Sequence, residues 1–214
     1  MLTFRKGKKQ PDWLDKKVAL FNRYWKLQGE KIFKKVTNLA NFEWPSKLVE
    51  SGITVYVKSD RKSEYLGLIF EDHPEKIDLF IKKSYKFSRI RSALIHELLH
   101  SIMWARIKDG RIKGPSLFED FFADEIIVSI VEKLANLNRS LTKKDCEDAL
   151  LFGIDQAKER LNLRSLKRRR GYQGLLDYLL DFSNNYRKNI KNSDILKERK
   201  KVNQNIPSPI MFEM

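Results

Sequence analysis

The sequence is poor in residues that cross-link small folds or anchor chains in membranes. Cys146 is the only cysteine among 214 residues, which excludes an internal disulfide framework and a zinc site built from cysteines. A single thiol fits a reducing compartment, although it also allows a secreted protein that is poor in cysteine. No apolar run reaches the roughly 18 residues of a membrane span, and residues 1–9 lack the apolar core of a signal peptide. We therefore expect a cytoplasmic protein that does not cross a membrane.

Histidine is also scarce, and two of the three histidines form a pattern. His96 and His100 lie four residues apart with Glu97 directly after the first, which makes an HExxH motif. On a helix, residues i and i+4 share a face, so both imidazoles can bind one ion while the carboxylate points toward the same space. In this motif the histidines bind Zn²⁺ and the Glu is general base toward the metal-bound water. The third histidine, His73, precedes Pro74 in a predicted turn and lacks ligand spacing to the motif.

The residues around the motif are apolar, which predicts a buried helix rather than a solvated one. Two neutral imidazoles and a carboxylate on one buried face need polar partners, and a metal ion supplies them at once. The alternative is a pair of core histidines without a metal, each with its own hydrogen-bond partner. We favour the metal.

Hydrophobic periodicity predicts an α+β fold. Apolar residues at helical spacing alternate with segments of period two, and short polar breaks between the strands favour a small, three-stranded, mainly antiparallel sheet. The expected elements are an N-terminal helix at 12–28, a second short helix at 30–39 after an interruption at Gly29, strands at 53–58, 65–70 and 77–82, the HExxH helix at 88–107 with Ser88 as its N-cap, a carboxylate-bearing helix at 116–136, and C-terminal helices at 141–151, 154–163 and 175–182.

We divide the chain into three functional segments. Residues 1–138 are the expected metal-binding core with its N-terminal helix, 139–190 a basic helical extension, and 191–214 a flexible tail. The tail ends in an apolar stretch within 204–214 that could fold back into a cleft as an inhibitory plug.

The net charge of +15 is concentrated in two regions outside the motif. Residues 1–35 carry 11 Lys and Arg against 3 Asp and Glu, and residues 139–203 carry 17 against 9, whereas 36–138 are balanced at 15 against 15. Basic flanks of this kind suit nucleic acid or another polyanion as a partner. A lysine-rich solvated surface explains them equally well, and the sequence has no helix-turn-helix, zinc-finger or RNA-binding signature.

A catalytic zinc ion needs three protein ligands, and the motif provides two. No further histidine is suitably placed, so the third ligand must be a carboxylate from the helix at 116–136. On a helical projection Asp120 and Asp124 fall on the apolar face, whereas Glu125 and Glu132 gather on the opposite, polar side. A carboxylate on an apolar face must be paired or metal-bound.

We therefore expect Asp120 as third ligand and Asp124 as the acceptor that orients a ligating histidine. Glu119 is the alternative third ligand, although it also completes a predicted capping box with Ser116. In a further alternative, both aspartates pair with Lys or Arg from the basic flanks.

This arrangement resembles the zincin (HExxH) zinc metallopeptidases, in a small gluzincin-like form. Gluzincins follow the motif with Glu-x-x-x-Asp, whose Glu binds zinc and whose Asp supports a histidine. Residues 120–124 read Asp-Phe-Phe-Ala-Asp, 20 residues after His100, with Asp where Glu is expected. The resemblance covers about residues 50–137. It implies a peptidase that aligns its substrate along an edge strand of the sheet.

The sequence thus predicts a zinc-dependent metalloendopeptidase, a hydrolase of peptides or proteins with Glu97 as general base. One alternative is a nucleic-acid-associated protein similar to the SprT-like proteases, which the basic flanks favour. Another is a catalytically silent, metal-binding regulatory protein, which Asp in place of Glu at position 120 suggests.

Overall fold

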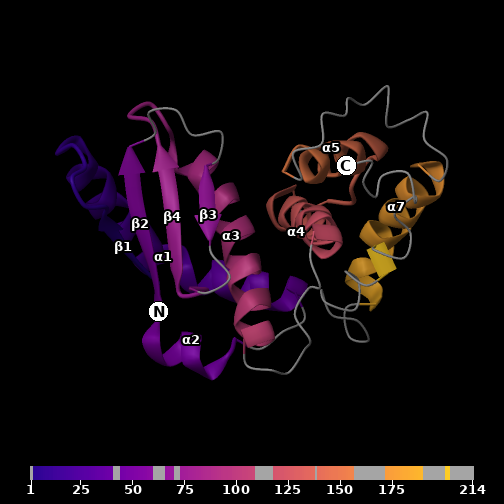
Figure 1. Cartoon of the computed structure of the whole chain (residues 1–214), viewed down its shortest axis with the longest axis horizontal. Helices are drawn as coiled ribbons and strands as arrows, with labels where there is room; N and C mark the ends of the chain where they lie inside the picture. The colour runs from indigo at the N-terminus through magenta and orange to yellow at the C-terminus, as the bar shows by residue number, and fades with distance from the viewer. Residues whose placement is uncertain are drawn as a thin grey trace. The chain divides into compact units, whose positions relative to one another are not determined.

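The computed structural model describes residues 2–40, 44–59, 66–69, 73–108, 118–137, 139–156, 172–189 and 201–202. Contacts divide the chain into two compact units, one formed by Met1–Asn38 with Phe42–Lys113 and the other by Leu39–Asn41 with Gly114–Met214. Figure 1 labels their helices and strands. The functional segments predicted at 1–138, 139–190 and 191–214 are not tested by this grouping and stay predictions.

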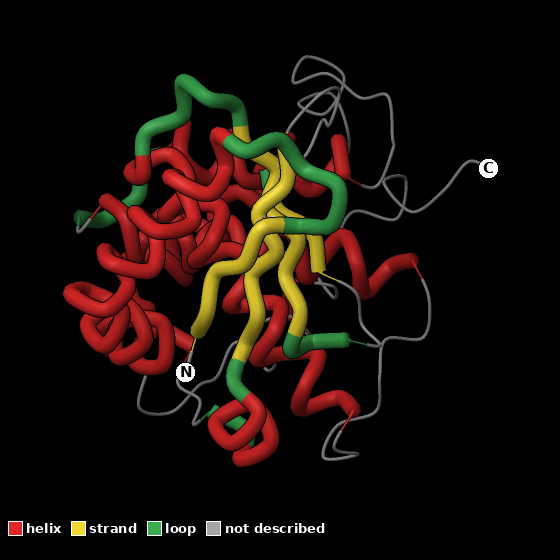
Figure 2. Tube along the Cα trace, turned by 90° about the vertical axis from the view of Figure 1, so that its left-hand side faces the viewer, coloured by secondary structure: helices red, strands yellow, loops and turns green. Residues whose placement is uncertain are grey.

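The first unit is built on a four-stranded sheet, whose strands lie side by side in Figure 2. Across the sheet the order is β1 (Leu2–Lys6), β2 (Ile53–Ser59), β4 (Lys76–Ile81) and β3 (Gly67–Ile69). The pairs β1–β2 and β2–β4 are parallel, and β3 runs antiparallel to β4.

The predicted α+β class is confirmed, but the predicted three-stranded, mainly antiparallel sheet is wrong. The first strand was missed, and two of the three pairings are parallel. The physical reason lies in the two most regular strands: β2 and β4 both alternate fully buried with half-buried residues. They take the centre of the sheet beside each other, and the short β3 is left at the edge.

Helices α1 (Trp13–Ala40) and α3 (Phe87–Lys108) cover the same face of this sheet, and a short helix α2 (Ser46–Ser51) precedes β2. Phe4 of β1 contacts Phe21 of α1 edge to face, with ring centroids 5.6 Å apart. Through the register of the sheet, Phe4 and Gly67 of β3 share one face, and Gly67 lies against Glu97 of α3. The core of the first unit therefore lies between the sheet and these two helices.

The N-terminal helix is a single element, so the predicted interruption at Gly29 is wrong. One glycine inside a helix costs only about 1 kcal/mol relative to alanine. At Gly29 the indole of Trp25 packs over the backbone, and an added Cβ would come within 2.7 Å of its ring. Packing of the helix on the sheet outweighs the local penalty.

The second unit contains α4 (Phe118–Leu137), α5 (Lys143–Gln156) and α7 (Tyr172–Asn189). The predicted helix at 116–136 corresponds to α4. The predicted break near residue 152 is absent, because α5 runs through it. At the start of α5, Thr142 and Asp145 exchange hydrogen bonds between side chain and backbone, which is the reciprocal arrangement of a capping box.

Several predicted features lie outside the described residues. These are Ser116 and the tail beyond 190 except residues 201–202. Within the described ranges, no helix has the length and apolar character needed to cross a membrane.

Candidate metal centre

Helix α3 carries both motif histidines in the interior of the first unit. Every residue from Leu94 to Ala105 is buried, because this segment is apolar on most sides and packs against β3 and β4. The exposed fraction is 7% for His96 and 3% for His100. Their spacing of four residues places the rings one helical turn apart, with centroids separated by 4.9 Å.

The two imidazoles converge through their Nε2 atoms, which are 3.2 Å apart. Two nitrogens that bind one tetrahedral zinc ion at 2.0–2.1 Å lie about 3.4 Å from each other. Both rings therefore suit a shared cation with almost no rearrangement.

Two neighbouring residues of α3 fix the position of this histidine pair. Trp104 stacks on His100 with an interplanar angle of 13° and ring centroids 6.4 Å apart. The hydroxyl of Ser101, which is fully buried, donates a hydrogen bond to the backbone carbonyl of Pro74. The Ser101 hydrogen bond connects the histidine-bearing turn to the segment that leads into β4. Together with the Trp104 contact, it fixes the positions of the imidazoles.

The carboxylate of the motif lies against the edge strand. Glu97 is 7% exposed, and its side chain occupies the space next to the bare backbone of Gly67 in β3. The general-base candidate and the edge strand are thus held together inside the first unit.

Two buried side chains of the first unit form a pair that could hold a metal ion. His96 and His100 each offer an imidazole nitrogen, and within the second unit Glu125 is a buried carboxylate. Two imidazole nitrogens and one carboxylate oxygen are a donor set that catalytic zinc sites use, with a fourth position left for water or substrate. The histidine pair supplies two of these ligands, and its chemistry fits zinc.

The carboxylates that the sequence favoured lie at the start of α4. Asp120, Asp124 and Glu119 belong to this helix, but their side chains lie outside the described part of the structure. Asp120 as third ligand, Asp124 as orienting acceptor and Glu119 as alternative therefore stay predictions. Glu125 was not proposed as a ligand from the sequence.

The expectation that Glu125 faces a polar side of its helix is wrong. It is 6% exposed, and Ser129 on the same side is 4% exposed. The helical projection fails here because α4 is apolar around most of its circumference, and the residues from 125 to 131 are all buried. The few polar side chains on such a helix are buried in the interior and need hydrogen-bond or ionic partners there.

The second unit has a buried carboxyl group whose partner is a neighbouring helix. Glu147 of α5 accepts a hydrogen bond of 2.9 Å from the hydroxyl of Tyr172 in α7. Burial raises the pKa of that tyrosine most, and the hydrogen bond to Glu147 raises it further. Burial also raises the pKa of the adjacent Cys146 thiol to about 12, despite a hydrogen bond with Ser183. A thiol with so high a pKa stays protonated, so Cys146 serves packing rather than nucleophilic chemistry.

Sequence reasoning missed the close approach at Gly67 and the burial of Glu125. For Gly67 a signal existed, because a lone glycine inside a strand pattern often marks a close backbone approach. For Glu125 the helical periodicity wrongly predicted an exposed position.

His73 is exposed and near Glu75, with 3.2 Å between Nδ1 and Oε1, which agrees with its predicted place in a turn.

Comparison of the chain with models of protein families, with curated proteins and with solved structures finds no match.

Proposed function

We propose that this protein is a zinc-dependent metallopeptidase of the zincin type. The observation that carries the proposal is the buried α3 turn, where two imidazole Nε2 atoms converge at 3.2 Å and Glu97 lies beside an edge strand. Zinc is the metal we infer, because two histidines with a carboxylate suit its preference for nitrogen and oxygen ligands. His96 and His100 would hold it, and we propose a carboxylate of α4, Asp120 or Glu125, as the third ligand.

In this proposal the metal and the protein side chains have separate roles. When bound, zinc would polarise the scissile carbonyl and make a water molecule acidic near neutral pH. Glu97 accepts the proton of the attacking water on its carboxylate and then delivers it to the leaving amine, first as general base and then as general acid. His96 and His100 would hold the ion through their Nε2 atoms, and Trp104 and Ser101 keep that turn in place.

The edge strand β3 suggests how a substrate would bind. Phe80 donates its backbone N–H to the carbonyl of Leu66 at 2.8 Å, so Leu66 and, two residues on, Leu68 direct their peptide groups toward β4. By the same alternation, Gly67 and Ile69 direct theirs away from β4. An extended peptide could add a strand there through main-chain hydrogen bonds. We therefore expect substrates with an extended, accessible segment.

The first experiment combines metal analysis with peptide cleavage. The protein is purified without added metal, and zinc content and turnover of an unstructured protein substrate are measured. We expect bound zinc and cleavage in the unaltered chain, loss of both in His96→Ala, and retained zinc in Glu97→Gln with cleavage reduced by at least about 10²-fold. Glu50→Gln, which changes an exposed carboxylate on α2, is the matched control and should leave both unchanged.

Each result bears on a different part of the proposal. Unchanged cleavage in Glu97→Gln would contradict the assigned general base. Bound zinc without turnover in any variant would favour the silent regulatory alternative. Comparison of Glu125→Gln with Asp120→Asn decides the third ligand, because loss of the coordinating carboxylate should weaken zinc binding by more than the roughly 10- to 100-fold that loss of a supporting hydrogen-bond partner costs.

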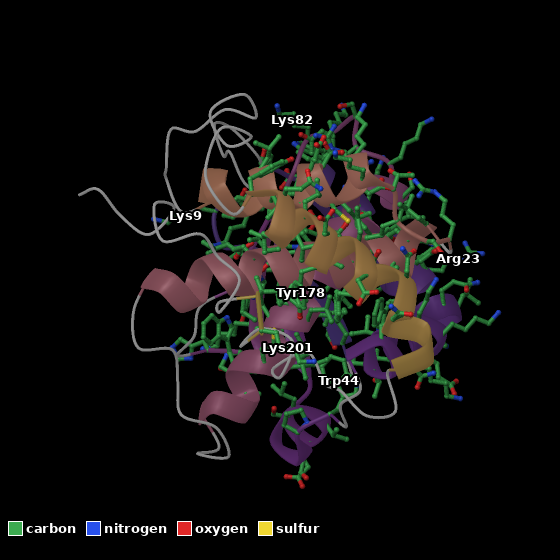
Figure 3. All side chains as sticks on the ribbon, turned by 90° about the vertical axis from the view of Figure 1, so that its right-hand side faces the viewer. Lys9, Arg23, Trp44, Lys82, Tyr178 and Lys201 are labelled. Atoms are coloured by element: carbon green, nitrogen blue, oxygen red, sulfur yellow. The ribbon has the colours of Figure 1, made fainter. Side chains whose placement is uncertain are left out.

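A second candidate, a nucleic-acid-associated protease, is favoured by the outer side of α1. Its exposed positions carry five cations, one of which, Arg23, projects from the ribbon in Figure 3. They are Lys16, Arg23, Lys26, Lys31 and Lys34. Retention on DNA that weakens steeply with salt would support this candidate; retention that is weak at low salt would count against it.

A further inference from the structure

The closest approach between β3 and α3 occurs at a residue without a side chain. An alanine Cβ built at Gly67 would lie 2.5 Å from Cγ, 2.6 Å from Oε1 and 2.8 Å from Cδ of Glu97. These distances are shorter than non-bonded carbon and oxygen atoms tolerate. The Glu97 side chain therefore fills the volume that any other residue at position 67 would need.

The requirement for glycine at position 67 comes from this contact and not from the backbone. Among described glycines, Gly52 is the one with a positive φ, so the conformation of Gly67 would accept an L-residue. The three nearest atoms all belong to the outer part of one flexible side chain. An alanine at position 67 can thus be accommodated if Glu97 turns away, without displacing either backbone.

We propose that Gly67 is a positioning residue for Glu97. Its bare backbone lets the edge strand pass close to α3 and confines the Glu97 carboxylate to the place beside that strand. Loss of this confinement would leave the metal ligands intact but move the carboxylate away from the water it must deprotonate. The catalytic consequence rests on the proposed peptidase function, whereas the packing relation between the two residues does not.

The test uses Gly67→Ala in the full chain, with Gly174→Ala as control. An added Cβ at Gly174, on α7, would meet nothing within 4 Å, so the control makes the same chemical change in open space. We expect Gly67→Ala to fold, to bind as much zinc as the unaltered protein, and to lose about 10- to 100-fold in kcat with little change in KM, as a misplaced catalytic group does. Gly174→Ala should keep kcat, KM and zinc content.

Two further measurements make the outcome decisive. A crystal structure of Gly67→Ala should show the Glu97 carboxylate displaced; an unmoved carboxylate would overturn the proposal even if peptidase activity is absent from every variant. In the Glu97→Gln background, Gly67→Ala should lower the residual kcat no further, because the group it misplaces is already gone. An equal loss of kcat in both backgrounds would show that Gly67 acts independently of Glu97 and would also overturn the proposal.

Discussion

The two edges of the sheet differ in the described partners of their outward-facing backbone groups. At the β1 edge, Asn22 of α1 accepts a hydrogen bond from the N–H of Phe4 at 3.0 Å and donates one to its carbonyl at 2.9 Å. At the other edge, β3 pairs on one side with β4, and no other described strand lies beside it. There Gly67 and Ile69 direct their peptide groups outward.

The difference indicates which edge of the sheet is capped by a side chain and which edge, among the described residues, is open to pairing. An uncovered edge strand invites pairing with other chains, and proteins usually block it. Here a single amide side chain satisfies both peptide groups of Phe4 at one edge. Among the described residues no such side-chain cap is seen at the β3 edge, and this is the edge that passes Glu97. The asymmetry supports the view that β3 is the side on which a substrate strand is added.

Of the changes at the two edges, the largest effect is expected from disabling the β3 edge. Ile69→Pro removes an N–H that points away from β4, and proline is compatible with the outward side of an edge strand. We expect kcat/KM for peptides to fall about 10- to 100-fold, the equivalent of one lost hydrogen bond in a desolvated complex. Steady-state kinetics measure this, and circular dichroism checks that the fold persists.

The controls for this variant separate the donor from the side chain. Ile69→Val keeps the N–H and removes one methylene group. Any loss of kcat/KM that occurs in both Ile69→Val and Ile69→Pro is therefore due to side-chain packing. If Ile69→Pro folds normally and retains full kcat/KM, the substrate does not bind along β3, and the comparison of the two edges loses its functional meaning.

A smaller effect, on stability rather than activity, is expected at the opposite edge. Asn22→Ala leaves the buried N–H and carbonyl of Phe4 without their partner. We expect the free energy of unfolding to fall by about 1–3 kcal/mol, measured by urea denaturation, while zinc content and kcat/KM of the folded protein are kept. A loss of kcat/KM as large as that of Ile69→Pro would contradict the assignment of separate roles to the two edges.

The sequence predicted the elements with regular periods and local spacing. The HExxH helix follows from apolar residues around His96 and His100, and two of the strands follow from strict alternation. It could not predict the topology, because the pairing of β1 with β2 joins residues about fifty positions apart, such as Phe4 and Val55. The five-residue β1 also has too short an alternation to be distinguished from a basic terminus.

The candidate site was predictable as far as it depends on one helix. The spacing of His96 and His100 fixes their convergence, since both lie on α3. The place of Glu97 against Gly67 depends on how a strand crosses that helix, which residue spacing does not encode. Glu125 was assigned to a polar side because the projection ranked its neighbours by polarity, whereas burial of α4 is set by packing on several sides.

The smallest expected effect concerns an exposed ion pair at the end of β1. The ammonium of Lys6 lies 2.6 Å from Asp15 and 3.5 Å from Asp12, and the hydrogen bond with Asp15 raises the pKa of Lys6 above its ordinary value of 10.5. Because the raised pKa belongs to the folded state, the contribution to stability is complete below pH 10.5 and is lost as the pH rises through the folded-state pKa. Lys6→Gln should therefore lower Tm slightly at pH 7, and the difference from the unaltered protein should shrink at strongly alkaline pH and in about 1 M salt. A difference in Tm that persists under both conditions would mean that Lys6 stabilises the β1 edge through its aliphatic stem. In that case packing and local hydrogen bonds, such as those of Asn22, would stabilise this edge, and charge would not.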